Sequence, residues 1–393
     1  MKNTNTFVLV GAWRGNGDKS GGIISYLQQE DLTLKRVFEG FGEISVGRIV
    51  VDRTGSRIYC VNETKGGLGT QRFSGEVYAF SIDRETGELK KINAQQSIGV
   101  FPNSIAMHPS QKYLIVSNYG SEDTVVYSER DEKGVWQLKR RCEEGNVAVL
   151  PIGEDGAVLP VCELVVHDDP PSRHYPRTQS SPKPHSVDFS PDGSLVVVTD
   201  RGCDLVVVYR FDVMTGKLTR CFSEKIPDGL GPRNSVFHPS LPYFFVACEL
   251  YPYVLSFSYD AGTGTVRKTC MARAVKSLRE EQDLMKNFMR MAHPADIHVH
   301  PAGNKLTVSV RGYNQISMFD IQSDTGMLTL AQEIPSGGRC PRSCMWNKDG
   351  TALYVGNQES GEISVFNYSI RDGAYQLVQS IQEKRTPVCI AIC

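Results

Sequence analysis

The stretch "KPHSVDFSPDGSLVVVTDRG", residues 183–202, decides the fold. Two apolar segments, "HSVDF" and "SLVVVT", have the composition of β-strands, and the turn signal "SPDG" separates them. His185 begins the first strand, and Arg201 follows the second. We therefore interpret the stretch as an antiparallel hairpin that carries a histidine and an arginine at its open end.

The same pattern recurs along the chain. Each copy has an apolar strand, a turn such as DRTG, HPS, HPAG or NKDG, and a second strand rich in Val, Tyr and Leu. Internal repetition of this kind indicates a repeat architecture. The other copies are "VGRIVVDRTGSRIYCVNET" from Val46, "FPNSIAMHPSQKYLIVSNYG" from Phe101, "GPRNSVFHPSLPYFFVACEL" from Gly231, "HPADIHVHPAGNKLTVSVRG" from His293 and "CPRSCMWNKDGTALYVGNQE" from Cys340.

A third and a fourth strand usually follow, joined by hairpins such as "VYAFSIDRETGELKKI". Four strands in roughly 45–60 residues predict a β-propeller blade. Six complete units are visible, and a seventh is expected from "TPVCIAIC" at one chain end with "FVLVGAW" and "GGIISYLQQ" at the other. The sequence thus predicts an all-β, seven-bladed β-propeller of four-stranded blades, one domain over residues 1–393, closed by its terminal strands.

Two segments depart from the repeat. Residues 121–145 precede a strand that begins at Asn146, and residues 267–293 separate two units. We expect both to be insertions on the face where the first strands begin, which we call the mouth face. The stretch "MARAVKSLREEQDLMKNFMRM", 271–291, has the only helical pattern in the chain and is expected to form a helix.

The composition excludes several classes of partner. The 393 residues are 40% hydrophobic, with 43 basic and 44 acidic side chains. This balance gives no sign of a nucleic-acid or membrane-surface partner, and no apolar run could span a bilayer. The N-terminal apolar run is too short for a secretory signal, and the eleven cysteines have no zinc or redox spacing. We therefore expect a cytoplasmic protein with a small-molecule partner, while the sequence carries no signal for an oligomeric state.

The register of the repeat places two sets of residues at the mouth. Strand one is innermost and strand two is antiparallel to it, so the start of one and the end of the other share a face. The first set surrounds the central channel and comprises Gly47, Asn103, His185, Arg233, Ala295 and Arg342. The second set lies just outside and comprises Glu63, Tyr119, Arg201, Glu249, Arg311 and Gln358. The split seventh unit contributes Val388 and Trp13.

The residue types in these two sets differ from unit to unit, whereas the rest of the repeat keeps similar types. Charged and polar groups that converge in a concavity suggest a binding or catalytic site. Arginine suits the capture of carboxylate or phosphate, and a nearby glutamate stays ionised. His298 and His300 alternate on one strand, but no third ligand stands at metal spacing, so we expect no metal and no cofactor.

The motifs "PKPHSVDFSPDG", "GLGPRNSVFHPS", "VSNYG" and "SVRGYNQISMFDI" resemble the lactonase family of seven-bladed propellers. That family includes propeller-type 6-phosphogluconolactonases and 3-carboxy-cis,cis-muconate lactonizing enzymes. The resemblance covers almost the whole chain and implies that His185, Arg233, Glu249 and Arg311 are catalytic. All four belong to the two sets derived from the repeat. Five further members of those sets are predicted to bind substrate: Arg201, Arg342, Tyr119, Asn103 and Gln358.

The resemblance implies a metal-independent hydrolase of an anionic sugar lactone, similar to 6-phosphogluconolactonase, in which Glu249 or His185 activates water. Arg233 and Arg311 would hold the anionic group and stabilise the oxyanion. Two alternatives stay open. One is a lactonizing cyclase of the muconate type that acts on a polycarboxylate, and the other is a non-catalytic propeller that serves as an interaction scaffold.

Overall fold

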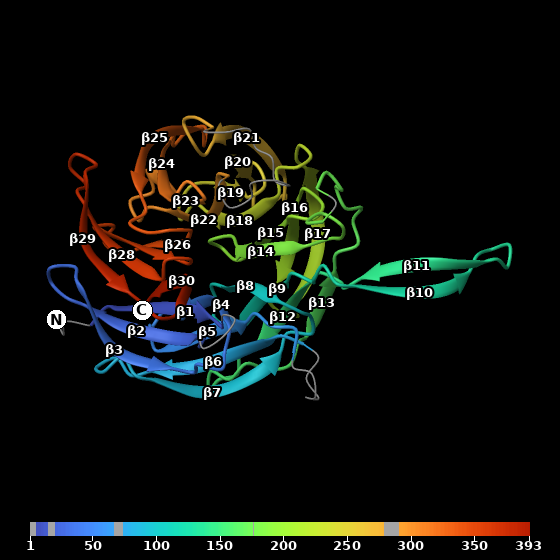
Figure 1. Cartoon of the computed structure of the whole chain (residues 1–393), viewed down its shortest axis with the longest axis horizontal. Helices are drawn as coiled ribbons and strands as arrows, with labels where there is room; N and C mark the ends of the chain where they lie inside the picture. The colour runs from blue at the N-terminus through green and yellow to red at the C-terminus, as the bar shows by residue number, and fades with distance from the viewer. Residues whose placement is uncertain (1–4, 15–19, 67–73, 176, 279–290) are drawn as a thin grey trace.

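The computed structural model describes residues 5–14, 20–66, 74–175, 177–278 and 291–393. Seven four-stranded antiparallel sheets surround a central axis, and a two-stranded hairpin projects from the ring (Figure 1). The architecture is therefore all-β, and the predicted seven-bladed propeller is confirmed.

Each sheet is one blade, numbered along the chain and written from its innermost to its outermost strand. Blades 1 and 2 contain β4 (Val46–Val51), β5 (Arg57–Asn62), β6 (Glu76–Ile82) and β7 (Leu89–Gln96), then β8 (Pro102–Met107), β9 (Tyr113–Asn118), β12 (Asn146–Pro151) and β13 (Glu163–Val166). Blades 3 and 4 contain β14 (Pro184–Phe189), β15 (Leu195–Asp200), β16 (Leu205–Asp212) and β17 (Lys217–Lys225), then β18 (Pro232–Phe237), β19 (Tyr243–Cys248), β20 (Tyr253–Tyr259) and β21 (Val266–Arg273).

Blades 5 and 6 contain β22 (His293–Val299), β23 (Lys305–Arg311), β24 (Gln315–Ile321) and β25 (Leu328–Pro335), then β26 (Pro341–Trp346), β27 (Ala352–Asn357), β28 (Glu362–Tyr368) and β29 (Tyr375–Gln382). Blade 7 contains β30 (Thr386–Ile392), β1 (Phe7–Trp13), β2 (Gly22–Gln28) and β3 (Leu34–Gly40). The innermost strands contact one another in the closed order β4, β8, β14, β18, β22, β26, β30 and back to β4.

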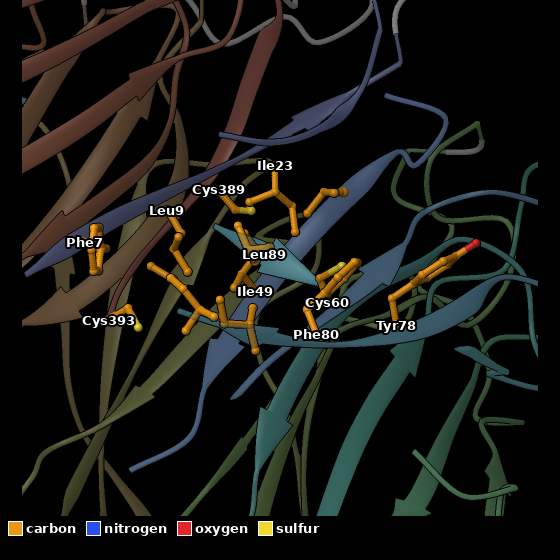
Figure 2. Packing of buried hydrophobic residues seen from close by; sticks show 14 of the residues in the cluster. Phe7, Leu9, Ile23, Ile49, Cys60, Tyr78, Phe80, Leu89, Cys389 and Cys393 are labelled. Carbon is orange, nitrogen blue, oxygen red and sulfur yellow. The ribbon is translucent and has the colours of Figure 1, made fainter. Parts of the chain in front are cut away.

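The hydrophobic core lies between neighbouring blades. All of β15 is buried because both of its faces pack against other sheets, whereas the outermost strand β17 is largely exposed. Figure 2 shows one inter-blade cluster, in which Phe7, Leu9 and Ile23 of blade 7 pack against Ile49 and Phe80 of blade 1. Burial on two faces accounts for the uninterrupted apolar runs that mark the repeat in the sequence.

Histidines in the turns between first and second strands join blade 4 to blade 5 and blade 5 to blade 6. His238 Nε2 lies 2.7 Å from the carbonyl oxygen of Gly303, and His300 Nε2 lies 2.9 Å from that of Gly350. Both glycines have positive φ, and a Cβ atom at either would meet the imidazole ring of the neighbouring blade. These histidines thus hold the face opposite the mouth.

Both chain ends meet in blade 7. β1 pairs antiparallel with β30 on one side and with β2 on the other. The backbone N–H of Cys393 donates to the Phe7 carbonyl at 2.8 Å, and the N–H of Phe7 donates back at 3.1 Å. The predicted closure of the ring by terminal strands in one blade is confirmed.

The first predicted insertion is a hairpin of β10 (Thr124–Arg130) and β11 (Trp136–Cys142), placed between β9 and β12 (Figure 1). The second insertion begins later than predicted, because residues 267–273 belong to β21. The predicted helix 271–291 is wrong for 271–278, where β21 ends and bends follow, while 279–290 lie outside the described residues. Pairing of β21 with β20, such as Leu255 with Met271, outweighs the local helical pattern.

Deletion of residues 386–393 is expected to open the ring. It removes β30, which leaves one edge of β1 unpaired and uncovers the inner strands of blades 1 and 6. We expect one cooperative thermal transition for the full chain, and aggregation or a much lower melting temperature after truncation. Circular dichroism with light scattering measures both. A truncated chain that melts like the full one would contradict this role of β30. Several thermal transitions in the full chain would contradict the single domain, which stays a prediction.

Candidate active site

The channel-lining residues stand at β-bulges. In β14 the pairing with β15 passes from Pro184 directly to Ser186, so His185 is the extra residue. Arg233 in β18 and Arg342 in β26 are skipped in the same way, and a comparable shift occurs in every blade. A bulge bends the strand and redirects one side chain. His185, Arg233 and Arg342 consequently line the central channel.

The second set is anchored beside the first by backbone hydrogen bonds. The N–H of Arg201 donates to the Lys183 carbonyl at 3.0 Å, and the N–H of Glu249 donates to Gly231 at 2.7 Å. Each acceptor lies two residues before the bulged residue of the same blade. The two sets therefore meet at one mouth, as the repeat register predicts.

Glu249 is the centre of the charged cluster at this mouth. Its Oε2 lies 2.5 Å from Arg201 Nε, and its Oε1 lies 2.5 Å from Arg311 Nη2 and 3.6 Å from Arg233 Nε. The four side chains come from blades 3, 4 and 5, and each is less than 10% exposed. One buried carboxylate thus holds three guanidinium groups together.

The arginines determine the charge of Glu249. Burial by itself would raise the pKa of this carboxyl group, but the charges of Arg201, Arg311 and Arg233 outweigh burial and hold the pKa well below its usual range. Burial and the neighbouring Arg311 and Arg342 also lower the pKa of Arg233, to about 9. Arg201, predicted from the sequence to bind substrate, is also a direct partner of Glu249.

His185 lies beside this cluster in a neutral state. Its ring is in edge-to-face contact with Tyr119, with centroids 5.6 Å apart. Burial lowers the pKa of His185 well below its usual value, and Arg233 lowers it further by repulsion. The same Tyr119 hydroxyl accepts a hydrogen bond from Arg201. His185 is therefore a neutral imidazole next to a strongly cationic cluster.

A second carboxylate group lies across the mouth. Trp13 Nε1 donates to Glu63 Oε2 at 2.9 Å, and the Arg342 guanidinium lies 3.9 Å from the centre of the Trp13 ring. Burial raises the pKa of Glu63, against the opposing effect of Arg342. Gln358 Oε1 accepts from Arg342 at 3.5 Å, while Asn103 lines the channel wall. All nine predicted site residues consequently lie in or beside the mouth.

Sequence reasoning missed Lys183 as a member of this region. Its side chain is fully buried, and its Nζ donates to the Ser121 carbonyl at 3.1 Å and lies 4.9 Å from the centre of the Tyr119 ring. Burial lowers the pKa of this ammonium group. The only sequence signal was its position two residues before His185, which does not reveal burial.

Four buried polar atoms of the cluster have no hydrogen-bond partner within the described structure: His185 Nδ1, Arg201 Nε, Arg233 Nε and Arg311 Nε. Arg201 Nε is close to Glu249 but does not direct its N–H at the carboxylate. Buried polar groups are normally satisfied. Unsatisfied donors concentrated at one concave place are therefore suited to an anionic or carbonyl-bearing ligand.

A cavity of about 600 Å³ opens at the other end of the channel. Turn residues such as Pro109, Pro191 and Pro301 surround it, and neither His185 nor Glu249 contributes to its wall. It therefore lies apart from the charged cluster, and we place the candidate site at the mouth.

Within the described ranges of the chain, no group of three or more His, Cys, Asp or Glu side chains is arranged to hold a metal ion. The same ranges contain no helix that is long and apolar enough to cross a bilayer.

The fold and the mouth define a class, a seven-bladed propeller with a buried carboxylate among arginines at one end of its channel. The chain belongs to the family described as "Lactonase, 7-bladed beta-propeller", whose model matches residues 8–392. The resemblance inferred from the four sequence motifs is thereby confirmed.

Relatives of this chain carry lactonase names. A 6-phosphogluconolactonase of Bacillus subtilis is 25% identical over 343 residues, which cover 87% of this chain and 85% of the relative. A 6-phosphogluconolactonase of Formosa agariphila is 28% identical over 307 residues, with 77% and 76% covered. A solved structure named as the periplasmic gluconolactonase of Pseudomonas aeruginosa superposes with a TM-score of 0.80 over 99% of each chain, at 24% identity. That superposition supports the fold.

Replacement of Glu249 by Gln is expected to destabilise the protein, because Arg201 and Arg311 lose their counter-charge while they stay buried. Loss of one partner from a buried ion pair costs about 3–5 kcal/mol. The pKa of Glu249 is lower in the folded state than in the unfolded state. The ionised carboxylate therefore stabilises the folded state above the unfolded pKa, about 4.3. This stabilisation is lost as the pH falls through the folded pKa.

Denaturant unfolding of wild type and Glu249→Gln, from neutral to acidic pH, measures this effect. The difference in unfolding free energy should be largest near neutral pH and smallest at the acidic end. Glu132→Gln, at an exposed position in the hairpin, is the matched control and should unfold like wild type. Equal stability of Glu249→Gln and wild type near neutral pH would contradict the ion-pair interpretation.

Proposed function

We propose that the chain hydrolyses an anionic sugar lactone of the 6-phosphogluconolactone type at this mouth. The observation that carries the proposal is the cluster of His185, Arg233, Glu249 and Arg311, in which buried nitrogen atoms lack partners among the described residues. Membership of the lactonase family and the names of the curated relatives support the same reaction class.

In the proposed reaction, the oxygen of a water molecule attacks the lactone carbonyl carbon, and a base takes one proton from that water. The carbonyl oxygen becomes an oxyanion that the N–H groups of Arg233 and Arg311 stabilise. The bond between the carbonyl carbon and the ring oxygen then breaks, and the ring oxygen takes the proton from the base. The product is an open-chain hydroxy acid, which releases a proton to solvent.

The geometry favours His185 over Glu249 as the base, a choice that the sequence left open. Both carboxylate oxygens of Glu249 face guanidinium groups at 2.5 Å, and its low pKa makes it a weak base. His185 is neutral, and its Nδ1 has no partner within the described chain. We therefore assign proton transfer to His185 and the positioning of Arg201 and Arg311 to Glu249.

Substrate binding would strengthen His185 as a base. In the free protein, burial and the charge of Arg233 lower the pKa of this histidine. An anionic substrate placed between Arg233 and Arg311 would offset part of that positive charge and raise the pKa towards neutrality. Proton transfer would then become effective in the complex that contains the lactone.

His185→Asn tests this assignment. We expect kcat to fall by about 100-fold or more, the usual scale for loss of a general base, with little change in KM. Glu249→Gln should raise KM as well, because Arg201 and Arg311 lose the carboxylate that orients them. Both variants are measured below their melting temperatures. A nearly unchanged kcat for His185→Asn, together with abolished turnover for Glu249→Gln, would make Glu249 the base.

The function itself is tested with purified protein and 6-phosphogluconolactone. We expect hydrolysis well above the spontaneous rate, and since no proposed step involves a metal, turnover should survive exhaustive treatment with EDTA. A carboxymuconate substrate tests the lactonizing alternative in parallel. Cyclisation of the muconate without lactone hydrolysis would overturn the proposed reaction. Inertness towards both substrates would favour the scaffold alternative.

We also propose a cytoplasmic location for the protein. All eleven cysteines are free thiols, and five of them are fully or partly accessible, including Cys162 and Cys221 on the surface. Exposed unpaired cysteines are typical of reducing compartments. The proposed partner of the protein in this compartment is its substrate, the small anionic lactone.

A further inference from the structure

The hairpin of β10 and β11 projects from blade 2 and is exposed along almost its whole length (Figure 1). Its two strands form a sheet of their own, so each has one edge that pairs with no strand of the described structure. A two-stranded hairpin is at best marginally stable in water by itself, and free strand edges are suited to association with another chain. This hairpin, which we call the arm, therefore lacks the packing that the seven blades have.

One face of the arm is both apolar and positively charged. It is formed by cross-strand neighbours, which lie on the same side of a sheet. We call it the arm face, and its members are Val126 with Arg140, Ser128 with Leu138, and Arg130 with Trp136. Val126, Trp136 and Leu138 are 56%, 63% and 78% exposed. Arg130 lies over the Trp136 ring at 4.8 Å, and Arg140 makes no ion pair with a described residue. The arm face thus exposes three large apolar side chains and two guanidinium groups, and its members include no carboxylate.

The outermost strand of the same blade leaves a complementary face uncovered. β13 has four residues, whereas the outermost strands of the other blades have seven to nine. Leu164 and Val166 alternate along β13 and are 39% and 42% exposed. The N–H of His167 donates to the Gly145 carbonyl at 3.0 Å, which continues the strand pairing, so Asp168 follows on the side of Val166. We call Leu164, Val166 and Asp168 the edge face. Asp168 is exposed and forms no ion pair with any residue that the structure describes.

The arm face and the edge face match in character. Each has apolar side chains beside a charge, and the charges are opposite, with Arg130 and Arg140 on the arm face and Asp168 on the edge face. Within one chain the arm points away from the ring and leaves the edge face exposed, so the matching faces can meet only between copies (Figure 1). Two arm faces would instead place like charges together, which disfavours pairing of arm with arm.

We propose that two copies of the chain associate by exchanging arms, with the arm face of each copy packed against the edge face of the other. Such an exchange is reciprocal, so it closes as a two-fold dimer with two identical contacts. Burial of Trp136 and Leu138 against Leu164 and Val166 supplies the apolar part of each contact. The dimer does not depend on the proposed lactone hydrolysis, because the arm carries none of the residues assigned to the active site.

Sedimentation velocity at increasing protein concentration tests the exchange of arms. Wild type should show a monomer–dimer equilibrium. Leu138→Asp places a negative charge on the arm face opposite Asp168, and Leu164→Lys places a positive charge on the edge face opposite the arginines. Each change should raise the dissociation constant of the dimer by about 10-fold or more. Met214→Asp and Met214→Lys are the matched controls, because Met214 is 84% exposed in the turn between β16 and β17, and both should associate like wild type.

A mixture of Leu138→Asp and Leu164→Lys chains tests whether the contact is reciprocal. In the mixed dimer, an unaltered arm meets an unaltered edge in one contact, and the two introduced charges have opposite signs in the other, so association should recover. Leu164→Lys leaves the arm unchanged, which separates loss of the edge face from loss of the hairpin. Wild type that stays monomeric, Leu164→Lys that associates like wild type through its arms, or a mixture that shows no recovery would each disprove the exchange.

Discussion

The pairing of β1 with β30 is the constraint on which the rest of the structure depends. This pairing joins blade 6 to blade 1 through blade 7, so the seven innermost strands form a closed ring. A closed ring has no free inner edge, and each blade is covered on both faces by its neighbours. Because every innermost strand then starts at the same end of the channel, side chains from distant parts of the sequence converge on one mouth.

β-Bulges direct several of the converging side chains into the channel, and this forms the candidate site. In a regular pairing, residues at the start of the innermost strands would alternate between the two faces of each blade. In blades 3, 4 and 6 the extra residue instead carries its side chain to the channel, which is how His185, Arg233 and Arg342 come to share one wall. The sheets hold the strands in fixed positions, and the bulges set the direction in which these side chains point.

The electrostatics of the mouth follow from placing more guanidinium groups than carboxylates in a buried space. Glu249 remains ionised because the charges of Arg201, Arg311 and Arg233 outweigh its burial. His185 remains neutral because burial, and then the charge of Arg233, lowers its pKa. Burial, together with the charges of Arg311 and Arg342, also lowers the pKa of Arg233. An anionic ligand would relieve this excess of positive charge, so the proposed affinity for anions and the proposed basicity of His185 would be coupled through a single set of contacts.

The sequence by itself determined the propeller, the split seventh blade and the members of the two mouth sets, because the repeat register is periodic and hydrophobic burial enforces it. It could not reveal that Arg201 pairs with Glu249, that Lys183 is buried, or that residues 271–273 complete β21. Those features depend on contacts between residues far apart in the chain, across blades or between strands. Local pattern specifies which side chains reach the mouth, whereas only the closed tertiary structure decides which of them touch and how they share charge.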